Sequence, residues 1–337
     1  MNAPALRRAL TRTSTVAALT GLLALGLTAC GDSEQESKGT ESQSRTYEAD
    51  NGEIEIPASP ERVVATGYAV PVLIESGADL VGISQWSRGT ALMDADDLAT
   101  YEELEKVAGE SAAETNYEAI AGLRPDLIVI GVPAPALVDV DMDRLEDIAP
   151  VVVLGPAAPD GWRELAERQA DAAGATEGFE ATKAAYEERA AELSEKYGEV
   201  LADLDFGHVG AYGDVSAGTF HREYAGSWGT NIAGDLGVQY YGEPSEPGEG
   251  AEAVTEYPSI EELPEKLGEA DVITYTVGPD GKPDDAVQYV LDHKLWQNLP
   301  PVKADRAFGV RYTEAATFAS AIKTLDSLDA ALEPLLP

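Results

Sequence analysis

The chain has 337 residues, with 61 acidic and 23 basic side chains and a formal net charge of −38. So strong an acidity argues against nucleic acid and anionic lipid as partners, because both are bound through clustered lysine and arginine. The single cysteine and the three scattered histidines, His208, His221 and His293, are poor material for a zinc site. The length exceeds that of one typical core and predicts two domains.

The N-terminus has the pattern of a bacterial export signal. Arg7, Arg8 and Arg12 form a positively charged segment without acidic residues, and an apolar run of about a dozen residues follows, too short to span a bilayer stably. The sequence Leu-Thr-Ala-Cys ending at Cys30 comes next and resembles a bacterial lipobox. The resemblance implies that residues 1–29 are a signal peptide and that Cys30 is acylated, for example with palmitate. We therefore expect a lipoprotein anchored to the extracytoplasmic face of the cell membrane.

Residues 30–48 are predicted to be a flexible linker behind the lipid anchor. The segment up to Arg45 is rich in Ser, Glu, Gln, Gly and Thr and has no large apolar residue, so it cannot bury a core. Removal of residues 1–29, which contain three arginines and no acidic residue, would take the formal charge from −38 to −41. With Cys30 used for lipid, no disulfide is possible.

Residues 49–173 are predicted to form an N-terminal α/β lobe, because strand-like and helix-like runs alternate along them. The predicted strands are 62–66, 80–84, 126–130 and 151–154, and the predicted helices are 70–76, 117–123 and 142–148. Such alternation is typical of a parallel sheet with helices on its faces.

Residues 174–205 contain the longest helical pattern, from Glu177 to about Leu204, with Thr176 as its predicted N-cap. Apolar residues recur on one helical face, at Phe179, Tyr186, Ala190, Leu193, Tyr197, Leu201 and Leu204. We expect one connecting helix, roughly 40 Å long at about 1.5 Å per residue. Two shorter helices broken near Gly198 are the alternative, but a helical glycine costs only about 1 kcal/mol.

Residues 206–337 repeat the alternation and predict a C-terminal α/β lobe. The predicted strands are 208–212, 238–241, 272–276 and 308–311, and the predicted helices are 228–236, 260–267 and 318–332. The fold class is therefore α/β, with two lobes joined by a single long helix.

Four segments resemble, in order and spacing, those of a known family. They are Pro-Glu-Arg-Val-Val-Ala from Pro60, Asn-Tyr-Glu-Ala-Ile-Ala-Gly-Leu-Arg-Pro-Asp-Leu-Ile-Val-Ile from Asn116, Ser-Ile-Glu-Glu-Leu from Ser259, and Trp-Gln-Asn-Leu-Pro-Pro-Val-Lys-Ala-Asp-Arg from Trp296. Together they resemble the substrate-binding proteins of iron-siderophore and vitamin B12 ABC importers, over about residues 50–337. The resemblance implies Rossmann-like lobes of the class III periplasmic-binding-protein type, a ligand in the cleft between them, and a receptor rather than an enzyme.

The loops after the predicted strands are where a ligand is expected, because open α/β sheets bind ligands beyond the carboxyl ends of their strands. In three of these loops arginine stands near aromatic residues. The predicted ligand contacts are Trp86, Arg88, Tyr212, His221, Arg222, Tyr224, Trp228, Tyr275, Arg311 and Tyr312. Arginine suits the oxygen-rich groups of a ferric siderophore and also stacks on rings. Alternatively, these arginines pair with local acids and the tryptophans belong to the core.

The resemblance also implies a membrane permease as partner. Members of the family present one acidic residue on each lobe to arginines of the permease, and Glu118 and Glu261 match these positions. The neighbouring Glu262 leaves the register open by one residue. Both acids follow a possible helix cap, where a carboxylate also gains about 0.3–1 kcal/mol from the helix dipole.

Other functions fit the sequence less well. No Gly-x-Gly-x-x-Gly follows the first strand and no Gly-x-Ser-x-Gly occurs, which disfavours a dinucleotide enzyme and a hydrolase. We expect a monomeric binding protein without cofactor, iron arriving only within the ligand. Vitamin B12 and haem remain alternatives, with Tyr224 or His221 as haem ligand. Among siderophores, hydroxamate and carboxylate types both suit arginine with aromatic residues, and of these we favour hydroxamates. The strongly anionic catecholates would need a more basic cleft.

Overall fold

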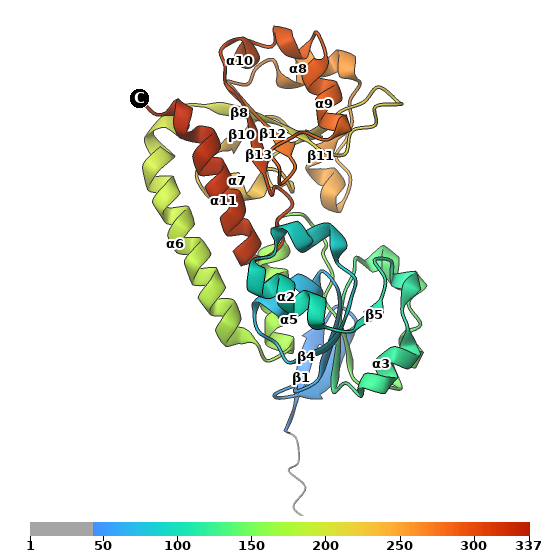
Figure 1. Ribbon diagram of the computed structural model, residues 1–337. Coiled ribbons are helices and arrows are strands. Elements are labelled where there is room, and N and C mark those ends of the chain that lie inside the picture. Colours follow the sequence, from blue (N-terminus) through green and yellow to red (C-terminus); the bar gives the residue numbers. More distant parts are fainter. Residues whose placement is uncertain (1–42) are drawn as a thin grey trace, which may run out of the picture. The chain divides into compact units, whose positions relative to one another are not determined.

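The computed structural model describes residues 43–337, which form two α/β lobes joined by the long helix α6 (Thr176–Leu201) (Figure 1). The predicted signal peptide 1–29, Cys30 and the first part of the predicted linker lie outside the described residues. Within residues 43–337, no helix combines the length and the apolar character needed to cross a bilayer.

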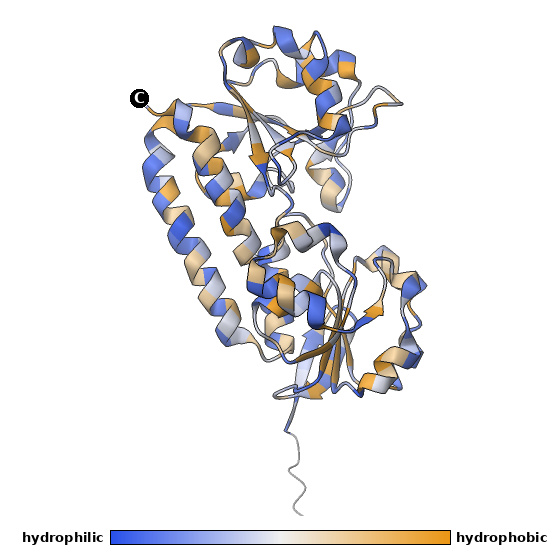
Figure 2. Ribbon diagram, viewed as in Figure 1, coloured by the Kyte–Doolittle hydropathy of each residue, from blue (hydrophilic) through white to orange (hydrophobic). Residues whose placement is uncertain are grey.

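The N-terminal lobe is built on a five-stranded parallel sheet with strand order β5-β4-β3-β6-β7. Its strands are β3 (Val63–Gly67), β4 (Leu80–Ser84), β5 (Lys106–Ala108), β6 (Leu127–Gly131) and β7 (Val151–Val153), and its helices are α1 (Ala69–Glu75), α2 (Ala95–Glu103), α3 (Tyr117–Leu123), α4 (Met142–Glu146) and α5 (Trp162–Ala172). The strands are runs of aliphatic residues, as expected of a parallel sheet buried on both faces, and Figure 2 shows them as apolar.

A hairpin precedes this sheet and corrects the predicted linker. Strands β1 (Ser44–Ala49) and β2 (Gly52–Pro57) pair antiparallel, so the prediction that the linker extends to residue 48 is wrong. The hairpin is anchored because Tyr47 and Ile56 are buried in the lobe's core. Its turn also donates a hydrogen bond to β7, from the Asp50 amide to the Val153 carbonyl at 2.9 Å.

The C-terminal lobe has a six-stranded mixed sheet in which β11, β9, β8, β12 and β13 follow one another and β10 also pairs with β8. Its strands are β8 (Asp205–Gly210), β9 (His221–Glu223), β10 (Gln239–Tyr240), β11 (Thr255–Glu256), β12 (Val272–Val277) and β13 (Ala307–Arg311), and its helices are α7 (Asn231–Gly234), α8 (Leu263–Leu267), α9 (Asp285–Asp292), α10 (Pro300–Lys303) and α11 (Phe318–Leu332). Strands β8, β12 and β13 are parallel, whereas β9 runs antiparallel to β8.

The connecting helix α6 is a single helix of 26 residues that continues through Gly198, as predicted. Its buried face consists of the predicted residues Phe179, Tyr186, Ala190, Leu193, Tyr197 and Leu201. Thr176 is the first helical residue rather than the N-cap, a position held by Ala175 without a side-chain hydrogen bond. Helix α11 lies alongside α6 (Figure 1), and Tyr197 Oη donates to the Asp329 carbonyl at 2.7 Å.

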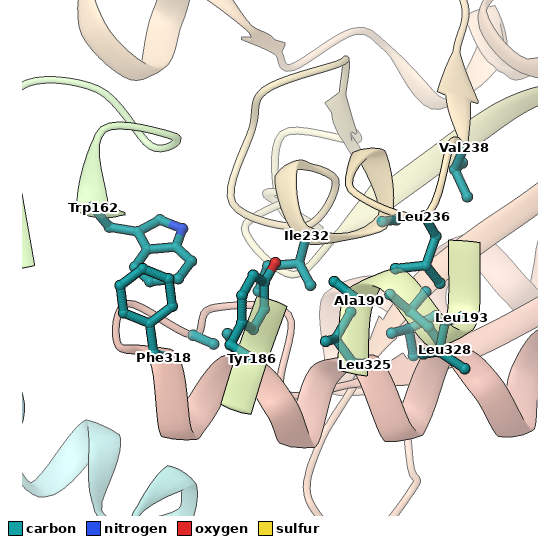
Figure 3. Close-up of a cluster of buried hydrophobic side chains, with 14 of the residues drawn as sticks. Trp162, Tyr186, Ala190, Leu193, Ile232, Leu236, Val238, Phe318, Leu325 and Leu328 are labelled. Carbon is teal, nitrogen blue, oxygen red and sulfur yellow. The ribbon is translucent and has the colours of Figure 1, made fainter. Parts of the chain in front are cut away.

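An aromatic cluster joins both lobes to the connecting helix (Figure 3). Trp162 of α5 packs edge-on against Phe318 of α11, with ring centroids 4.9 Å apart, and Tyr186 of α6 lies 5.4 Å from the same ring. The indole nitrogen of Trp162 also donates to Asn231 Oδ1 of the C-terminal lobe at 2.9 Å. Aromatic side chains of this size bury large apolar areas, so the cluster stabilises the arrangement of the two lobes on α6.

Some predicted elements differ from the structure at their ends. The predicted strand 208–212 begins earlier and ends at Gly210, and the predicted helix 228–236 is reduced to the four residues of α7. Residues before α7 are instead held by hydrogen bonds to Glu223, described below. The helices 117–123 and 318–332 and the strand 80–84 match their predictions.

Candidate functional site

A cavity with a volume of about 330 Å³ lies between the two lobes, within the usual range of small-molecule sites. We call it the cleft. It is lined by Tyr68, Pro71, Glu75, Trp86, Arg88, Gly89, Leu92, Met93 and Asp97 of the N-terminal lobe and by Tyr212, His221, Trp228, Ala251, Thr255, Tyr257, Glu314, Ala316, Thr317, Ala319 and Ser320 of the C-terminal lobe. Several of these residues lie within three residues of the ends of the strands β3, β4, β8 and β13, where parallel sheets place ligands.

Three aromatic rings from both lobes meet in the cleft. Tyr68, which follows β3, lies edge-on to Trp86 at 4.9 Å and is stacked with Trp228 of the opposite lobe at 6.0 Å. Trp86 is held in place because its backbone amide donates to Tyr101 Oη at 2.9 Å. These rings offer an organic ligand apolar faces on both walls of the cleft.

Arg88 is the basic residue of the cleft lining, and it is stacked on aromatic rings. Its guanidinium carbon lies 4.1 Å from the centre of the Trp86 ring and 4.9 Å from that of Tyr68. A side chain at Gly89 would meet the Trp86 indole nitrogen at 2.1 Å, so glycine is required beside it. Stacking orders the guanidinium while its N–H groups stay exposed to the cleft, which suits contact with oxygen acceptors.

Three carboxyl groups also line the cleft: Glu75, Asp97 and Glu314. Burial raises the pKa of Glu75 to about 7, although the Ala319 amide donates to its Oε1 at 2.9 Å. Burial likewise raises the pKa of Asp97, with a further contribution from Asp94. It raises the pKa of Glu314 as well, even though a hydrogen bond from a tyrosine side chain opposes this. The cleft therefore holds carboxyl groups in surroundings that disfavour their negative charge.

Tyr212, His221 and Tyr257 form one wall in the C-terminal lobe. The rings of His221 and Tyr257 are stacked at 4.9 Å with an interplanar angle of 8°, and Tyr212 lies 5.7 Å from the imidazole. Burial lowers the pKa of His221, against the attraction of Glu223, and so favours the neutral imidazole. Burial, together with the hydrogen bond to Glu314, raises the pKa of Tyr212.

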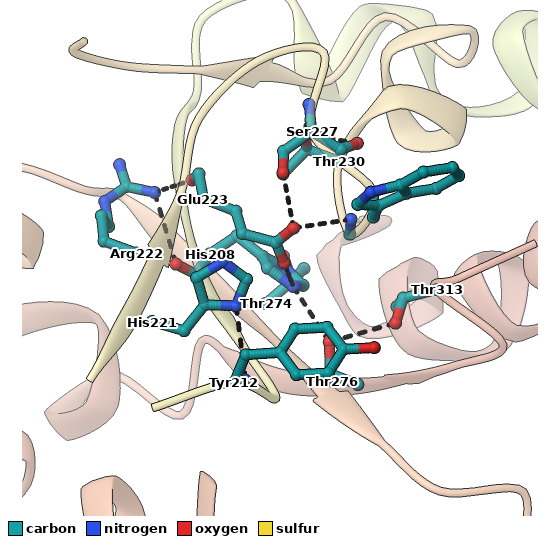
Figure 4. A network of polar contacts seen from close by, with 12 residues as sticks. His208, Tyr212, His221, Arg222, Glu223, Ser227, Thr230, Thr274, Thr276 and Thr313 are labelled. Atoms are coloured by element: carbon teal, nitrogen blue, oxygen red, sulfur yellow. Dashed lines mark hydrogen bonds and ion pairs between the residues drawn. The ribbon is translucent and has the colours of Figure 1, made fainter. Parts of the chain in front are cut away.

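Glu223 belongs to a buried polar network that includes His208 and Ser227 (Figure 4). The Glu223 carboxylate accepts hydrogen bonds from Ser227 Oγ at 2.6 Å and from the Gly229 amide at 3.1 Å, on either side of Trp228. Its other oxygen lies 3.2 Å from His208 Nε2. Burial alone would raise the pKa of Glu223, but these contacts outweigh it and hold the pKa well below its usual value. Glu223 thus fixes the loop that presents the indole to the cleft.

Five of the ten predicted contacts line the cleft: Trp86, Arg88, Tyr212, His221 and Trp228. Arg222 is a correction, because it is fully buried inside the C-terminal lobe. Its guanidinium stacks on Tyr224 at 4.4 Å and donates to the Tyr241 carbonyl at 3.0 Å. Tyr224 is not at the cleft either, since its hydroxyl donates to Glu256 within the same lobe.

The other three predicted contacts also lie outside the cleft lining. Tyr275 packs edge-on against Trp296 at 6.1 Å, on the sheet face opposite to its neighbours in β12. Arg311 is exposed, and its guanidinium lies near Gly281. Tyr312 adopts a left-handed backbone, with φ of 60°, and is part of the turn before α11. The predictions for these three residues are wrong because proximity to a strand end does not fix side-chain direction.

Five residues of the cleft lining with distinctive chemistry were not predicted from the sequence: Tyr68, Glu75, Asp97, Tyr257 and Glu314. Tyr68 and Glu314 follow β3 and β13 within a few residues, so the strand-end rule already pointed to their loops. The other three lie on α1, on α2 and beyond β11, and reach the cleft only through the packing of these elements.

The two glutamates predicted for permease contact are both exposed, Glu118 on α3 and Glu261 just before α8. Glu262 is engaged in a capping box, because its carboxylate accepts from the Ser259 amide at 3.1 Å. Of the two neighbours, Glu261 is therefore the one that presents its carboxylate to solvent. No group of three or more His, Cys, Asp or Glu side chains within residues 43–337 is arranged to hold a metal ion.

Fold and cleft together define a two-lobed receptor of the kind in which a small ligand is held between α/β lobes on a helical connection. Residues 63–311 match the periplasmic binding protein family, and the chain belongs to this family. The class III architecture predicted from the sequence is thereby confirmed.

Curated relatives and solved structures agree with the assignment to the periplasmic binding protein family. The chain is 27% identical to the iron(3+)-hydroxamate-binding protein YxeB of Bacillus subtilis, over 83% of this chain and 82% of that protein. It is 28% identical to the iron(3+)-hydroxamate-binding protein FhuD of the same organism, over 84% and 85%. The siderophore periplasmic binding protein from the fuscachelin gene cluster of Thermobifida fusca superposes with a TM-score of 0.65 and 32% identity, over 83% of this chain and 98% of that one.

Proposed function

We propose that this protein is the ligand-binding component of an ABC importer, and that it captures a ferric siderophore in the cleft and delivers it to a membrane permease. The observation that carries the proposal is Arg88, stacked at 4.1 Å on Trp86 in a cleft lined by aromatic rings from both lobes. Guanidinium N–H groups match the oxygen atoms that surround chelated iron, and the rings match an organic backbone. Iron enters as part of the ligand, and no chemical conversion is required of the protein.

A hydroxamate-type siderophore is the ligand class we favour. Both curated relatives bind iron(3+)-hydroxamates by name, and they align with more than four fifths of this chain. The cleft supports the same choice, since its lining holds three carboxyl groups and one guanidinium. A strongly anionic catecholate complex would face these carboxyl groups with little compensating charge.

The proposal includes a lipid anchor at Cys30 and a permease that docks on Glu118 and Glu261. The lipobox-like sequence and the polar segment behind it support the anchor. A Cys30→Ser variant, expressed in a host that processes lipoproteins, is expected to leave the membrane fraction as folded protein. Retention of the variant in membranes after alkaline washing would argue against lipid attachment at this residue.

Intrinsic fluorescence tests the ligand assignment, because Trp86 and Trp228 line the cleft whereas Trp162 and Trp296 are buried elsewhere. The protein is titrated with ferric hydroxamates, ferric catecholates, haem and cobalamin. We expect saturable quenching with the hydroxamates at the lowest concentrations, and a smaller amplitude in a Trp86→Phe variant. A Trp296→Phe variant is the matched control and should keep the full amplitude. Tighter binding of haem or cobalamin than of every siderophore would refute the assignment.

A further inference from the structure

The charged groups of the cleft are unequal in number. Among the described residues of its lining, Glu75, Asp97 and Glu314 carry carboxyl groups and Arg88 alone carries a guanidinium. The carboxyl groups come from both lobes, so a bound ligand meets them on both walls. Arg88 is already engaged with two aromatic rings, which leaves its N–H edge for the ligand.

His221 adds a polar group without adding charge. The side chain is only 3% exposed and lines the cleft, yet its Nε2 atom has no hydrogen-bond partner among the described residues. Nδ1 lies 3.5 Å from the Tyr212 amide, from which it accepts, so in the neutral ring the proton is on Nε2. A buried donor of this kind is satisfied by an acceptor atom, which a ligand oxygen in the cleft would supply.

We propose that the cleft selects among ferric chelates by their net charge, accepting neutral and positively charged complexes and rejecting negatively charged ones. The inference rests on the proposed function and makes it more specific. His221 and Arg88 donate hydrogen bonds to oxygen atoms of the chelate, and the carboxyl groups meet its outer substituents.

The physical basis is the cost of burying charge. A carboxylate on the ligand would approach Glu75, Asp97 or Glu314 in a partly desolvated cleft, where like charges repel more strongly than in water. An ammonium group on the ligand would instead gain a partner there. A neutral substituent avoids both effects, because it carries no charge for the carboxyl groups to repel or attract.

Three ligands with the same iron-binding core isolate the effect of charge. Ferrioxamine B carries a free ammonium group, its N-acetyl derivative is neutral, and its N-succinyl derivative carries a carboxylate. Dissociation constants are measured at pH 7.5 by tryptophan fluorescence. We expect affinity to fall in this order, with the ammonium ligand bound roughly tenfold more tightly than the succinyl ligand, about 1.4 kcal/mol.

Two variants connect the preference to the cleft. Asp97→Asn and Glu314→Gln should each reduce the ratio of the affinity for the ammonium ligand to that for the succinyl ligand. Each variant should bind the ammonium ligand more weakly and the succinyl ligand more tightly than wild type does. Glu180→Gln, on the exposed face of α6, changes the net charge of the protein by the same amount and should leave the ratio unchanged. Circular dichroism melting curves of all three variants establish that they are folded.

The outcomes separate this inference from the function on which it rests. Equal affinities for the three ligands would overturn charge selection while leaving siderophore capture intact. A ratio that responds equally to Glu180→Gln would also overturn it, since the effect would then arise from overall charge. If none of the three ligands binds and a catecholate does, both charge selection and the hydroxamate assignment are refuted.

Discussion

Alternation along a short strand decides which side chains meet the ligand. In β9, His221 faces the cleft and Glu223 supports the Trp228 loop, whereas Arg222 between them points into the lobe. Successive residues of a strand face opposite sides, so the three cannot all line one cavity. Both His221 and Arg222 were predicted as ligand contacts because three residues carry too little periodicity to be recognised as a strand.

The two arginines therefore give opposite expectations. Arg88→Ala should weaken binding of the ferric ligand by about 1.5–3 kcal/mol, as for hydrogen bonds to a charged group, and leave stability unchanged. Arg222→Ala should lower the free energy of unfolding by about 2 kcal/mol or more, because it leaves buried carbonyls without their donor. Urea unfolding and ligand titration of both variants test this. A stable Arg222→Ala variant that bound ligand poorly would contradict the structural role.

Glu75 predicts a pH dependence of stability, because burial raises its pKa to about 7 in the folded protein. Between the ordinary carboxyl pKa and about 7 the folded state binds more protons than the unfolded state, so stability falls as pH rises through this window. Glu75 changes the free energy of unfolding by at most about 3 kcal/mol across this window. The difference in free energy of unfolding between wild type and Glu75→Gln separates this contribution from those of the other carboxyl groups.

The measurement is urea unfolding of both proteins at pH 5, 6, 7 and 8. We expect the stability difference between them to change steadily up to about pH 7 and then level off. Glu180→Gln, which removes an exposed carboxylate of α6, serves as the control and should parallel wild type throughout. A parallel course for Glu75→Gln as well would show that the carboxyl group titrates normally.

The length of a helix or strand determined whether it could be predicted from the sequence. Helices α6 and α11 were predictable because many turns repeat the same apolar face. The short elements could not be predicted, because two to six residues carry too little periodicity and tertiary contacts stabilise them. These elements are the hairpin β1–β2, the strands β9 and β11, and the helix α7. Of the five predicted ligand contacts that do not line the cleft, Arg222 and Tyr224 lie on or just after the unpredicted β9. The other three lie on or just after strands that were predicted, but strand position alone did not give the direction of their side chains.

Two glycines of α6 allow the helix to be tested. A Cβ at Gly198 would meet no atom within 4 Å, whereas one at Gly178 would lie 2.2 Å from the Ser76 carbonyl oxygen at the end of α1. Gly198→Ala should therefore raise the free energy of unfolding by about 0.5–1 kcal/mol, the usual helical advantage of alanine. Gly178→Ala should lower it, because α1 must shift. Destabilisation by Gly198→Ala would contradict an uninterrupted helix.

In the molecule as a whole, several contacts besides α6 tie the lobes together. Glu75 of α1 accepts from the first turn of α11, Arg163 of α5 pairs with Asp235 at 2.6 Å, and Lys323 of α11 donates to the Met93 carbonyl. These contacts lie beside the cleft or along the helices, so they restrict how far the lobes can separate. Ligand exchange is expected to need limited opening rather than a wide hinge motion.

The exposed positions of Glu118 and Glu261 predict that capture and delivery can be separated. Neither residue lines the cleft, so charge reversal at both, Glu118→Lys with Glu261→Lys, should leave ligand affinity unchanged. Uptake of the iron chelate by cells should fall, because in the proposed docking each reversal would place a cation opposite a permease arginine. Repulsion between like charges at an interface costs most when the pair is desolvated. Charge reversal at both glutamates should therefore lower uptake more than reversal at one.

The comparison needs a control of equal charge change. Glu180→Lys with Glu187→Lys reverses two exposed residues of α6, away from the predicted docking positions, and should support normal uptake. Affinity is measured by fluorescence and uptake with radiolabelled iron chelate in the same strains. If uptake is normal with Glu118 and Glu261 reversed, the docking assignment is wrong. If uptake falls equally in the control, the loss comes from overall charge. If ligand affinity falls when Glu118 and Glu261 are reversed, these glutamates belong to the binding site instead.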